Sequence, residues 1–319
     1  MTHTIQAVAW TLIHFCWQAA AVAAIYAVVN KALARRSSNA RYVAALAALL
    51  LMLAASVATF AWEMRSGPAA SGASLGASFA TFPMGDHHTG SPLLMPAADP
   101  AQSASAGSSL VALLPPSFPL WIDAFWLLGV IALSFRSVGG WWLIQRLRSA
   151  ATIEAPAAAM ASFERIAGAL GLRRPVLLRV SSSIAGPLTV GVLRALVLLP
   201  LSAATSLSPE ELEVVLAHEL AHVRRADFFW NLVQTVAETL FFFHPAVWWV
   251  GSRLRHEREL CCDDLALKVC PDPLVYARAL FRLEEQRGSQ WQLAMALDGH
   301  QPPQTLRMRI ARILGEPLA

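Results

Sequence analysis

The stretch His218-Glu219-Leu220-Ala221-His222 decides how this chain is interpreted. Residues four positions apart lie on one face of an α-helix, so a helix here places the two imidazoles side by side. Two histidines at this spacing can bind one zinc ion, and the glutamate between them can accept a proton from an attacking water. The sequence therefore predicts a zinc site with His218 and His222 as ligands and Glu219 as general base.

The residues before this stretch favour a helix. Ser208 can be the N-cap, Pro209 fits the first helical position, and Glu211 completes a capping box. The helix that follows is largely apolar. Two buried imidazoles and a buried carboxylate would be costly on such a helix without a metal or other partners, which favours zinc over an accidental match.

A catalytic zinc usually has three protein ligands and one open position. Among the downstream histidines and acids, Glu259 and Asp263 stand out because their spacing places them on one helix face. The pattern predicts Glu259 as the third ligand and Asp263 as a residue that steadies a histidine ligand. The alternative is an exposed helix of mixed charge, since several arginines lie nearby.

Three further residues belong to the predicted site. Asp227 is expected to support it, and is the next ligand candidate if Glu259 does not reach the zinc. Tyr276 and His256 are candidates for stabilising the oxyanion of the reaction.

The composition indicates a membrane protein. Of the 319 residues, 56% are hydrophobic and only 14% are charged, against about 25% charged in ordinary soluble domains. Three apolar runs are long enough to span a bilayer. We therefore expect two transmembrane helices within residues 1–65, a disordered external loop over 66–119, a third transmembrane helix over 120–146 and a zinc peptidase domain over 147–319.

The basic residues predict the orientation. The loop between the first two spans is basic, whereas residues 66–119 contain no Lys or Arg. By the positive-inside rule, the first loop and the peptidase domain are cytoplasmic, and the N-terminus and the loop 66–119 are outside a bacterial inner membrane.

A membrane-dipping hairpin is expected at residues 231–250. This segment is apolar enough to span, but a straight crossing would carry Glu259 about 30 Å from the two histidines. Pro245 supplies a break, because proline ends or kinks a helix. The segment is therefore predicted to enter the membrane as a helical hairpin and return.

The peptidase domain is expected to be α+β. Residues 162–172 are predicted to form a helix, and the Val- and Leu-rich segments 176–180 and 190–199 are predicted strands. The second strand leads into the motif helix. It is the candidate for binding an extended substrate by strand addition, with ordinary core as the alternative.

The net charge of +4 alone would be compatible with a nucleic-acid partner, but the positions of the basic residues do not favour one. The basic residues lie beside apolar runs, where topology and anionic lipid explain them, and no groove-reading motif is present. We expect no direct nucleic-acid contact, and the four cysteines are interpreted as reduced thiols.

These motifs together resemble the BlaR/MecR-type integral-membrane zinc metallopeptidases. The resemblance rests on the blocks Leu12-Ile13-His14-Phe15-Cys16-Trp17-Gln18, Gly191 with Leu198-Leu199-Pro200, His218 through Asp227, Phe243-His244-Pro245 and Arg258 through Asp263. It implies a gluzincin-like cytoplasmic domain with His218, His222 and Glu259 as zinc ligands and Glu219 as base. The best-known members cleave a cytoplasmic target, often a transcriptional repressor, and carry a sensor domain after the peptidase.

This sequence differs from that pattern after the peptidase. Only about sixty residues follow Glu259 here, and no stretch among them is apolar enough to span a membrane. That does not favour a β-lactam sensor role.

The resulting expectation is a mainly α membrane protein that acts as a zinc metalloendopeptidase on a cytoplasmic protein, in signal-responsive, antirepressor-like regulation. A homodimer is left open. One alternative is a Ste24/HtpX-like membrane peptidase for quality control or processing. The other is a membrane receptor or scaffold that has a zinc site but does not cleave, which the intact Glu219 argues against.

Overall fold

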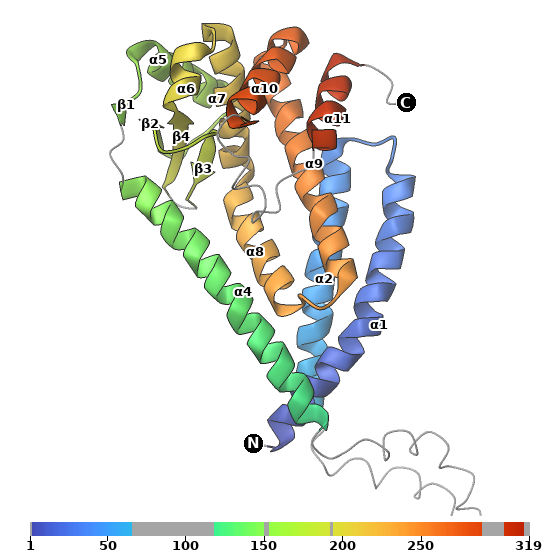
Figure 1. Ribbon diagram of the computed structural model, residues 1–319. Coiled ribbons are helices and arrows are strands. Elements are labelled where there is room, and N and C mark those ends of the chain that lie inside the picture. The colour runs from blue at the N-terminus through green and yellow to red at the C-terminus, as the bar shows by residue number, and fades with distance from the viewer. Residues whose placement is uncertain (1, 66–117, 150–152, 192–193, 289–302, 316–319) are drawn as a thin grey trace, which may run out of the picture. The chain divides into compact units, whose positions relative to one another are not determined.

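The computed structural model describes residues 2–65, 118–149, 153–191, 194–288 and 303–315 (Figure 1). The predicted external loop 66–119 lies outside the described residues except for its last two positions. The chain divides into two compact units, residues 1–18 with 54–128 and residues 19–53 with 129–319. The His218–His222 motif and its surroundings belong to the second unit.

Three helices in the described part of the chain are long and apolar enough to cross a membrane. They are α1 (Thr2–Ala32), α2 (Ser38–Arg65) and α4 (Phe118–Ser149), whose apolar part ends at Trp142. Large side chains such as Trp121 and Phe135 on α4 are exposed, as expected for a surface that faces lipid. The three helices match the predicted spans, and the chain is mostly helical, as expected.

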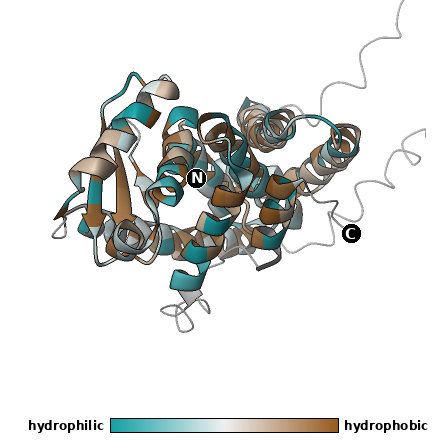
Figure 2. Ribbon diagram, turned by 90° about the horizontal axis from the view of Figure 1, so that it is seen from above, coloured by the Kyte–Doolittle hydropathy of each residue, from teal (hydrophilic) through white to brown (hydrophobic). Residues whose placement is uncertain are grey.

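A small mixed sheet lies in the second unit. Its strands are β1 (Ile153–Glu154), β2 (Val176–Ser181), β3 (Leu188–Val190) and β4 (Ala195–Pro200), in the spatial order β1-β2-β4-β3. β2 and β4 are parallel, and the two outer pairs are antiparallel. The apolar composition of these strands is visible in Figure 2.

The prediction of a single strand over 190–199 is wrong, because the chain reverses within it. Gly191 has a φ of 101°, and a Cβ there would collide with the carbonyl of Arg194; only glycine fits such a turn. β4 is buried along its whole length and paired on both sides. It cannot accept another strand, whereas β3 lies at the edge of the described sheet.

Helices cover the sheet and form one core with it. These are α5 (Ala157–Ala169), α6 (Leu201–Ser206), α7 (Pro209–Arg225), α10 (Pro273–Gly288) and α11 (Pro303–Leu314). Their buried side chains meet those of β4 in a continuous apolar cluster that includes Phe163, Ile166, Val197, Leu199, Leu216, Leu220, Leu280 and Ile313. The central strand and α7 are thus held by the same packing, which fixes the motif helix against the sheet.

The predicted break at Pro245 is confirmed. Helix α8 (Asp227–Leu240) and helix α9 (Pro245–Val269) are joined by a turn over residues 241–244. The His244 imidazole accepts a hydrogen bond from the backbone N–H of Ala246, and Pro245 occupies the first turn of α9. The cap and the proline start a new helix here, so the chain returns toward the motif helix.

The two helices of this hairpin pack closely at Gly251. A Cβ at Gly251 would overlap the side chain of Glu238 and lie in tight contact with that of Gln234. Gln234 donates to the Gly251 carbonyl at 3.0 Å, and Arg255 forms an ion pair with Glu238 at 2.6 Å. These contacts hold α8 and α9 together. Several large apolar side chains on it are exposed, namely Phe229, Leu232, Val236, Trp248 and Trp249, and its insertion into the membrane stays a prediction.

Candidate metal centre

Helix α7 begins with the capping box that its sequence predicts. The Ser208 hydroxyl accepts from the backbone N–H of Glu211 at 3.3 Å, and the Glu211 carboxylate accepts from the backbone N–H of Ser208 at 3.0 Å. Pro209 occupies the first turn. These contacts satisfy N–H groups that the helix itself leaves unpaired, so the start of α7 and the register of the motif are set locally.

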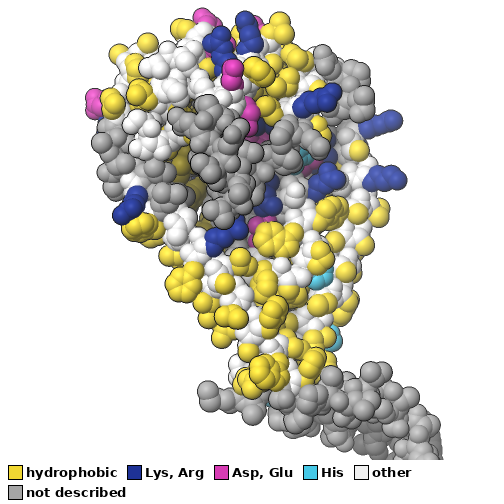
Figure 3. All heavy atoms as spheres, in the orientation of Figure 1, with side chains coloured by type: hydrophobic (Ala, Val, Ile, Leu, Met, Phe, Trp, Pro, Cys, Tyr) yellow, Lys and Arg dark blue, Asp and Glu magenta, His cyan; other side chains and the backbone are white. Residues whose placement is uncertain are grey.

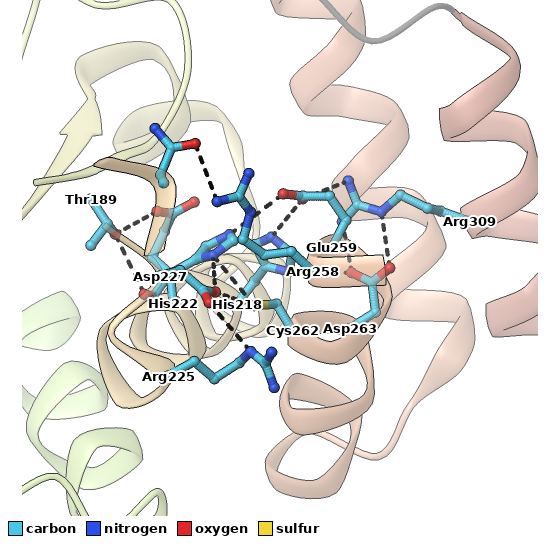
Figure 4. A network of polar contacts seen from close by, with 12 residues as sticks. Thr189, His218, His222, Arg225, Asp227, Arg258, Glu259, Cys262, Asp263 and Arg309 are labelled. Atoms are coloured by element: carbon cyan, nitrogen blue, oxygen red, sulfur yellow. Dashed lines mark hydrogen bonds and ion pairs between the residues drawn. The ribbon is translucent and has the colours of Figure 1, made fainter. Parts of the chain in front are cut away.

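Helices α7 and α9 bring three candidate ligands together (Figure 4). The Nε2 atoms of His218 and His222 lie 3.5 and 4.0 Å from the two carboxylate oxygens of Glu259. One ligand atom from each residue lies within 4.8 Å of the others. Their side chains are between 12% and 20% exposed, so the group is largely buried but still in contact with solvent.

This donor set fits zinc. Two imidazoles and one carboxylate are the protein ligands of a common type of catalytic zinc site, in which each donor lies about 2 Å from the metal. Donors around one tetrahedral ion are then separated by about 3.3 Å, close to the distance between His218 and Glu259. The hairpin turn is what makes this possible, because it returns α9 to the level of α7.

The far side of the His218 ring is held by two buried groups. Its Nδ1 atom lies 2.8 Å from the Tyr276 hydroxyl oxygen and 3.2 Å from Oδ1 of Asp263. Tyr276 in turn donates to Asp263 at 2.6 Å. Since the tyrosine proton is directed to the carboxylate, Nδ1 of the ring is the donor to the hydroxyl oxygen. Nε2, the nitrogen that faces Glu259, is then the one left for a metal.

His222 is oriented in the same way by different residues. Its Nδ1 atom lies 2.8 Å from Oδ2 of Asp227, a carboxylate that is only 3% exposed. The Cys262 thiol lies 3.3 Å from both groups, and Arg225 lies 3.5 Å from the other oxygen of Asp227. Each histidine therefore has a buried carboxylate behind it, an arrangement that fixes the ring and favours metal binding at Nε2.

Arg309 on α11 joins the third candidate ligand to this support. Its guanidinium donates to both oxygens of Asp263, at 2.9 and 2.6 Å, and lies 3.5 Å from the Glu259 carboxylate. A forked contact of this kind is strong and defines the orientation of the carboxylate. Arg309 thus restrains Asp263 behind His218 and Glu259 in front of it.

The electrostatics of the cluster favour a cation between the ligands. Burial alone would lower the pKa of His218, but hydrogen bonds to Asp263 and Glu259 outweigh it and raise that pKa to about 9. Burial would raise the pKa of Glu259, yet the two histidines and Arg309 hold it well below its ordinary value. The Glu259 carboxylate is therefore ionised, and it attracts positive charge to the point where the rings converge.

Glu219 lies beside the ligands and contacts the sheet. Its side chain is 8% exposed, and its Oε2 atom accepts a hydrogen bond of 2.7 Å from the Thr189 hydroxyl. Thr189 is the central residue of β3, the edge strand. The contact positions the carboxylate and brings the edge of the sheet next to the candidate metal centre.

A small cavity adjoins His222. Its volume is about 20 Å³, and it is lined mainly by Thr189, Gly191, Val223, Phe228 and Phe229 with the His222 ring. The cavity is mostly apolar and lies between the edge strand and the start of α8. It contacts the candidate ligand His222 directly.

The two predicted oxyanion candidates lie in different surroundings. Tyr276 is 1% exposed, and its hydroxyl is engaged behind His218. That position gives it a supporting contact rather than a free donor. His256 lines a different cavity with Arg253 and Arg312. Neither geometry favours an oxyanion contact.

Sequence reasoning missed Thr189, Cys262 in its contact with His222, and Arg309. No local pattern identifies Thr189 or Arg309, because each reaches the site from a distant part of the chain. Cys262 offered a signal, since it lies between Glu259 and Asp263 on a helix whose face was already predicted. Burial and Asp227 raise the pKa of its thiol well above the ordinary value, so it stays protonated.

Comparison with known proteins identifies the family of the chain. A family model described as BlaR1 peptidase M56 matches residues 10–313. The chain is 28% identical over 145 residues to the regulatory protein BlaR1 of Bacillus licheniformis, which covers 46% of this chain and 24% of that protein. It is 27% identical over 97 residues to the methicillin resistance mecR1 proteins of Staphylococcus aureus and Staphylococcus epidermidis, covering 30% of this chain and 17% of theirs. The chain thus matches less than a quarter of the length of these relatives. The family match nevertheless extends over most of the chain and includes every residue of the candidate metal centre, so this membrane protein belongs to the BlaR1 peptidase M56 family.

Proposed function

We propose that this protein is an integral-membrane zinc metalloendopeptidase that cleaves a cytoplasmic protein, with a transcriptional repressor as the favoured substrate class. The observation that carries the proposal is the convergence of His218, His222 and Glu259 on one point, with Glu219 beside them. A site that only needed a structural ion would have no use for the adjacent base. The names of the relatives, a regulatory protein and methicillin resistance proteins, support a regulatory role.

In the proposed reaction, zinc bound by His218, His222 and Glu259 would polarise the scissile carbonyl and lower the pKa of the attacking water. Glu219 accepts the proton of that water and delivers it to the leaving amine. Thr189 holds the Glu219 carboxylate through Oε2, which leaves Oε1 for the proton. Asp263 and Asp227 keep the two imidazoles in the tautomer that binds metal.

The edge strand β3 is the proposed binding place for the substrate backbone. Thr189 carries the contact to Glu219, so a peptide added alongside β3 would run past the general base. The apolar cavity beside His222 lies next to this strand and would receive a small side chain or part of a larger one. The predicted substrate contact thus moves from the buried β4 to its neighbour.

The decisive experiment separates metal binding from chemistry. Purified full-length protein in detergent is incubated with a candidate transcriptional repressor, such as one encoded by a neighbouring gene, with and without a chelator. Glu219→Gln should retain about one zinc per chain and lose about 100- to 10,000-fold in cleavage rate, because it removes the base and no ligand. Normal cleavage by Glu219→Gln would refute the mechanism.

Zinc content tests the ligand assignment independently. His218→Ala and His222→Ala should each abolish stoichiometric zinc in elemental analysis, since each removes one of three protein ligands. Full zinc content in the double variant would refute the site. Because this readout needs no substrate, it stands even if the repressor is the wrong substrate.

Two alternatives remain as outcomes of the same experiments. Cleavage of unfolded proteins such as casein, with no preference for the repressor, would indicate a quality-control peptidase. Zinc binding without cleavage of any protein would indicate a receptor or scaffold.

Cleavage of a cytoplasmic protein also requires the proposed membrane orientation. Reporter fusions at Ser37 and after Arg148 should report a cytoplasmic position, and fusions at Ser91 an external one. The opposite pattern would refute a cytoplasmic substrate.

A further inference from the structure

A second cavity lies in the same unit as the candidate metal centre but contains none of the candidate ligands. Its volume is about 380 Å³. Four segments surround it: the end of α1, the start of α2, the middle of α9 and the helix α11. The lining residues are Asn30, Ala34, Arg41, Arg253, His256, Glu257, Leu260, Met308 and Arg312.

The charge of this cavity is positive. Arg41 is anchored by an ion pair with Glu257 at 2.9 Å, and Arg312 by contacts to Asp264 at 2.7 Å and Ser38 at 2.9 Å. Arg253 is exposed and has no ion pair with another residue in the described ranges. A guanidinium has five N–H donors. Arg41 and Arg312 therefore keep N–H donors that their partners do not use. Arg253 adds a positive charge that no carboxylate in the described part of the chain neutralises.

The cavity lies at the level where two membrane spans end. The candidate span of α1 ends at Ala32, and that of α2 begins at Ser38, so Asn30, Ala34 and Arg41 lie next to the ends of both spans. Lipid phosphates lie where membrane spans emerge from the hydrocarbon core. Figure 3 shows Lys and Arg side chains gathered near these helix ends, with hydrophobic side chains covering the long helices.

We propose that this cavity is a binding site for the phosphate group of an anionic phospholipid headgroup. Arg41 and Arg312 are held by their carboxylate partners with donors to spare, and Arg253 supplies the free charge. Guanidinium groups bind phosphate through paired N–H donors, which suits a site that needs both charge and orientation. A membrane lipid is favoured over soluble phosphate because the cavity lies at the end of the spans.

A headgroup in this cavity would connect the membrane to the elements that support the candidate metal centre. Glu257 is two residues before Glu259 on α9, and Arg312 is three residues after Arg309 on α11. The lipid would contact α2, α9 and α11 together. The proposal does not depend on the peptidase activity, since lipid binding can be measured on protein with any substrate or none.

Full-length protein in detergent tests the proposal by native mass spectrometry with three probes: short-chain phosphatidylglycerol, short-chain phosphatidylcholine and inorganic phosphate. Wild type should bind phosphatidylglycerol about tenfold more tightly than phosphatidylcholine. Arg253→Gln should lower the affinity for phosphatidylglycerol by about tenfold, as expected for the loss of one charge-assisted contact. Arg307→Gln is the matched control, because Arg307 is an exposed arginine of α11 that does not line the cavity. It should bind like wild type.

Three results would overturn the proposal. Unchanged phosphatidylglycerol affinity in Arg253→Gln would show that the cavity does not bind the headgroup. Equal losses of phosphatidylglycerol affinity in Arg253→Gln and Arg307→Gln would show that the basic surface attracts anionic lipid without a specific site. Inorganic phosphate bound as tightly as the lipid would identify soluble phosphate as the source. Arg253 is exposed, so its substitution leaves the fold intact and each comparison stays interpretable.

Discussion

Helix α9 has two polar faces that differ in how fully their side chains are paired. On one, Asp263 is completely buried and is contacted by His218, Tyr276 and Arg309, while Glu259 lies against both motif histidines. On the neighbouring face, Arg253 is exposed, and the groups around it enclose a cavity of about 380 Å³. The first face is organised to hold a small cation in one position. The second face has arginine N–H donors without partners among the described residues and a cavity beside them, which suits a larger ligand that can exchange.

The comparison predicts that zinc binding depends on the first face alone, and Glu259 gives the largest effect. Glu259→Ala removes a proposed ligand and leaves two histidines, so zinc affinity should fall by roughly 100-fold or more, beyond the 10–100-fold typical of residues that only support ligands. Competition with a chromophoric chelator measures it on purified protein. Wild-type affinity in this variant would remove Glu259 from the ligand set, and Asp227 would be tested next.

Substitution of Asp263 or Arg309, which support the candidate ligands, should have the next largest effect on zinc affinity. Asp263→Asn and Arg309→Gln should each lower zinc affinity by about 10–100-fold, because His218 and Glu259 lose their restraint while the ligands remain. Arg309→Lys should recover only part of the zinc affinity lost in Arg309→Gln, since an ammonium cannot form the forked contact with Asp263. The exposed Arg307→Gln is the control. Equal zinc affinity in Arg309→Gln and Arg307→Gln would refute a positioning role for Arg309.

A smaller effect is expected at Thr189, which contacts the general base and no ligand. Thr189→Val removes one hydrogen bond to Glu219, and kcat should fall by about 2- to 10-fold with zinc affinity unchanged. Thr189→Ser should restore the rate, since it keeps the hydroxyl. A loss in Thr189→Ser as large as in Thr189→Val would indicate that the methyl group, and hence packing, matters instead.

The smallest effect on zinc should come from Glu257, only two residues from Glu259. Glu257→Gln should leave zinc affinity at the wild-type value, because Glu257 contacts Arg41 and lines the other cavity. Its melting temperature should nevertheless drop, since Glu257 is buried and Arg41 loses its charged partner. Thermal unfolding and chelator competition on one preparation test both statements. A clear loss of zinc would show that the two faces are coupled.

Local sequence patterns determined much of this protein. The capping box at Ser208, the four-residue spacing of His218 and His222, and the break at Pro245 each act within one or two helical turns, so each could be predicted from neighbouring residues. The spacing of Glu259 and Asp263 likewise placed both on one face of α9. The three apolar spans follow from length and composition.

Only the tertiary structure decided what lies behind and beside the ligands. Arg309 reaches Asp263 across 46 positions of the chain, and Thr189 reaches Glu219 across 30. No periodicity links such positions, because these contacts arise from the packing of α11 and β3 around the shared core. The same holds for β3 and β4, which read as one apolar strand until the turn at Gly191 separates them. Helix faces are encoded by residues a turn apart, whereas the partners of a buried charge depend on which distant elements pack against it.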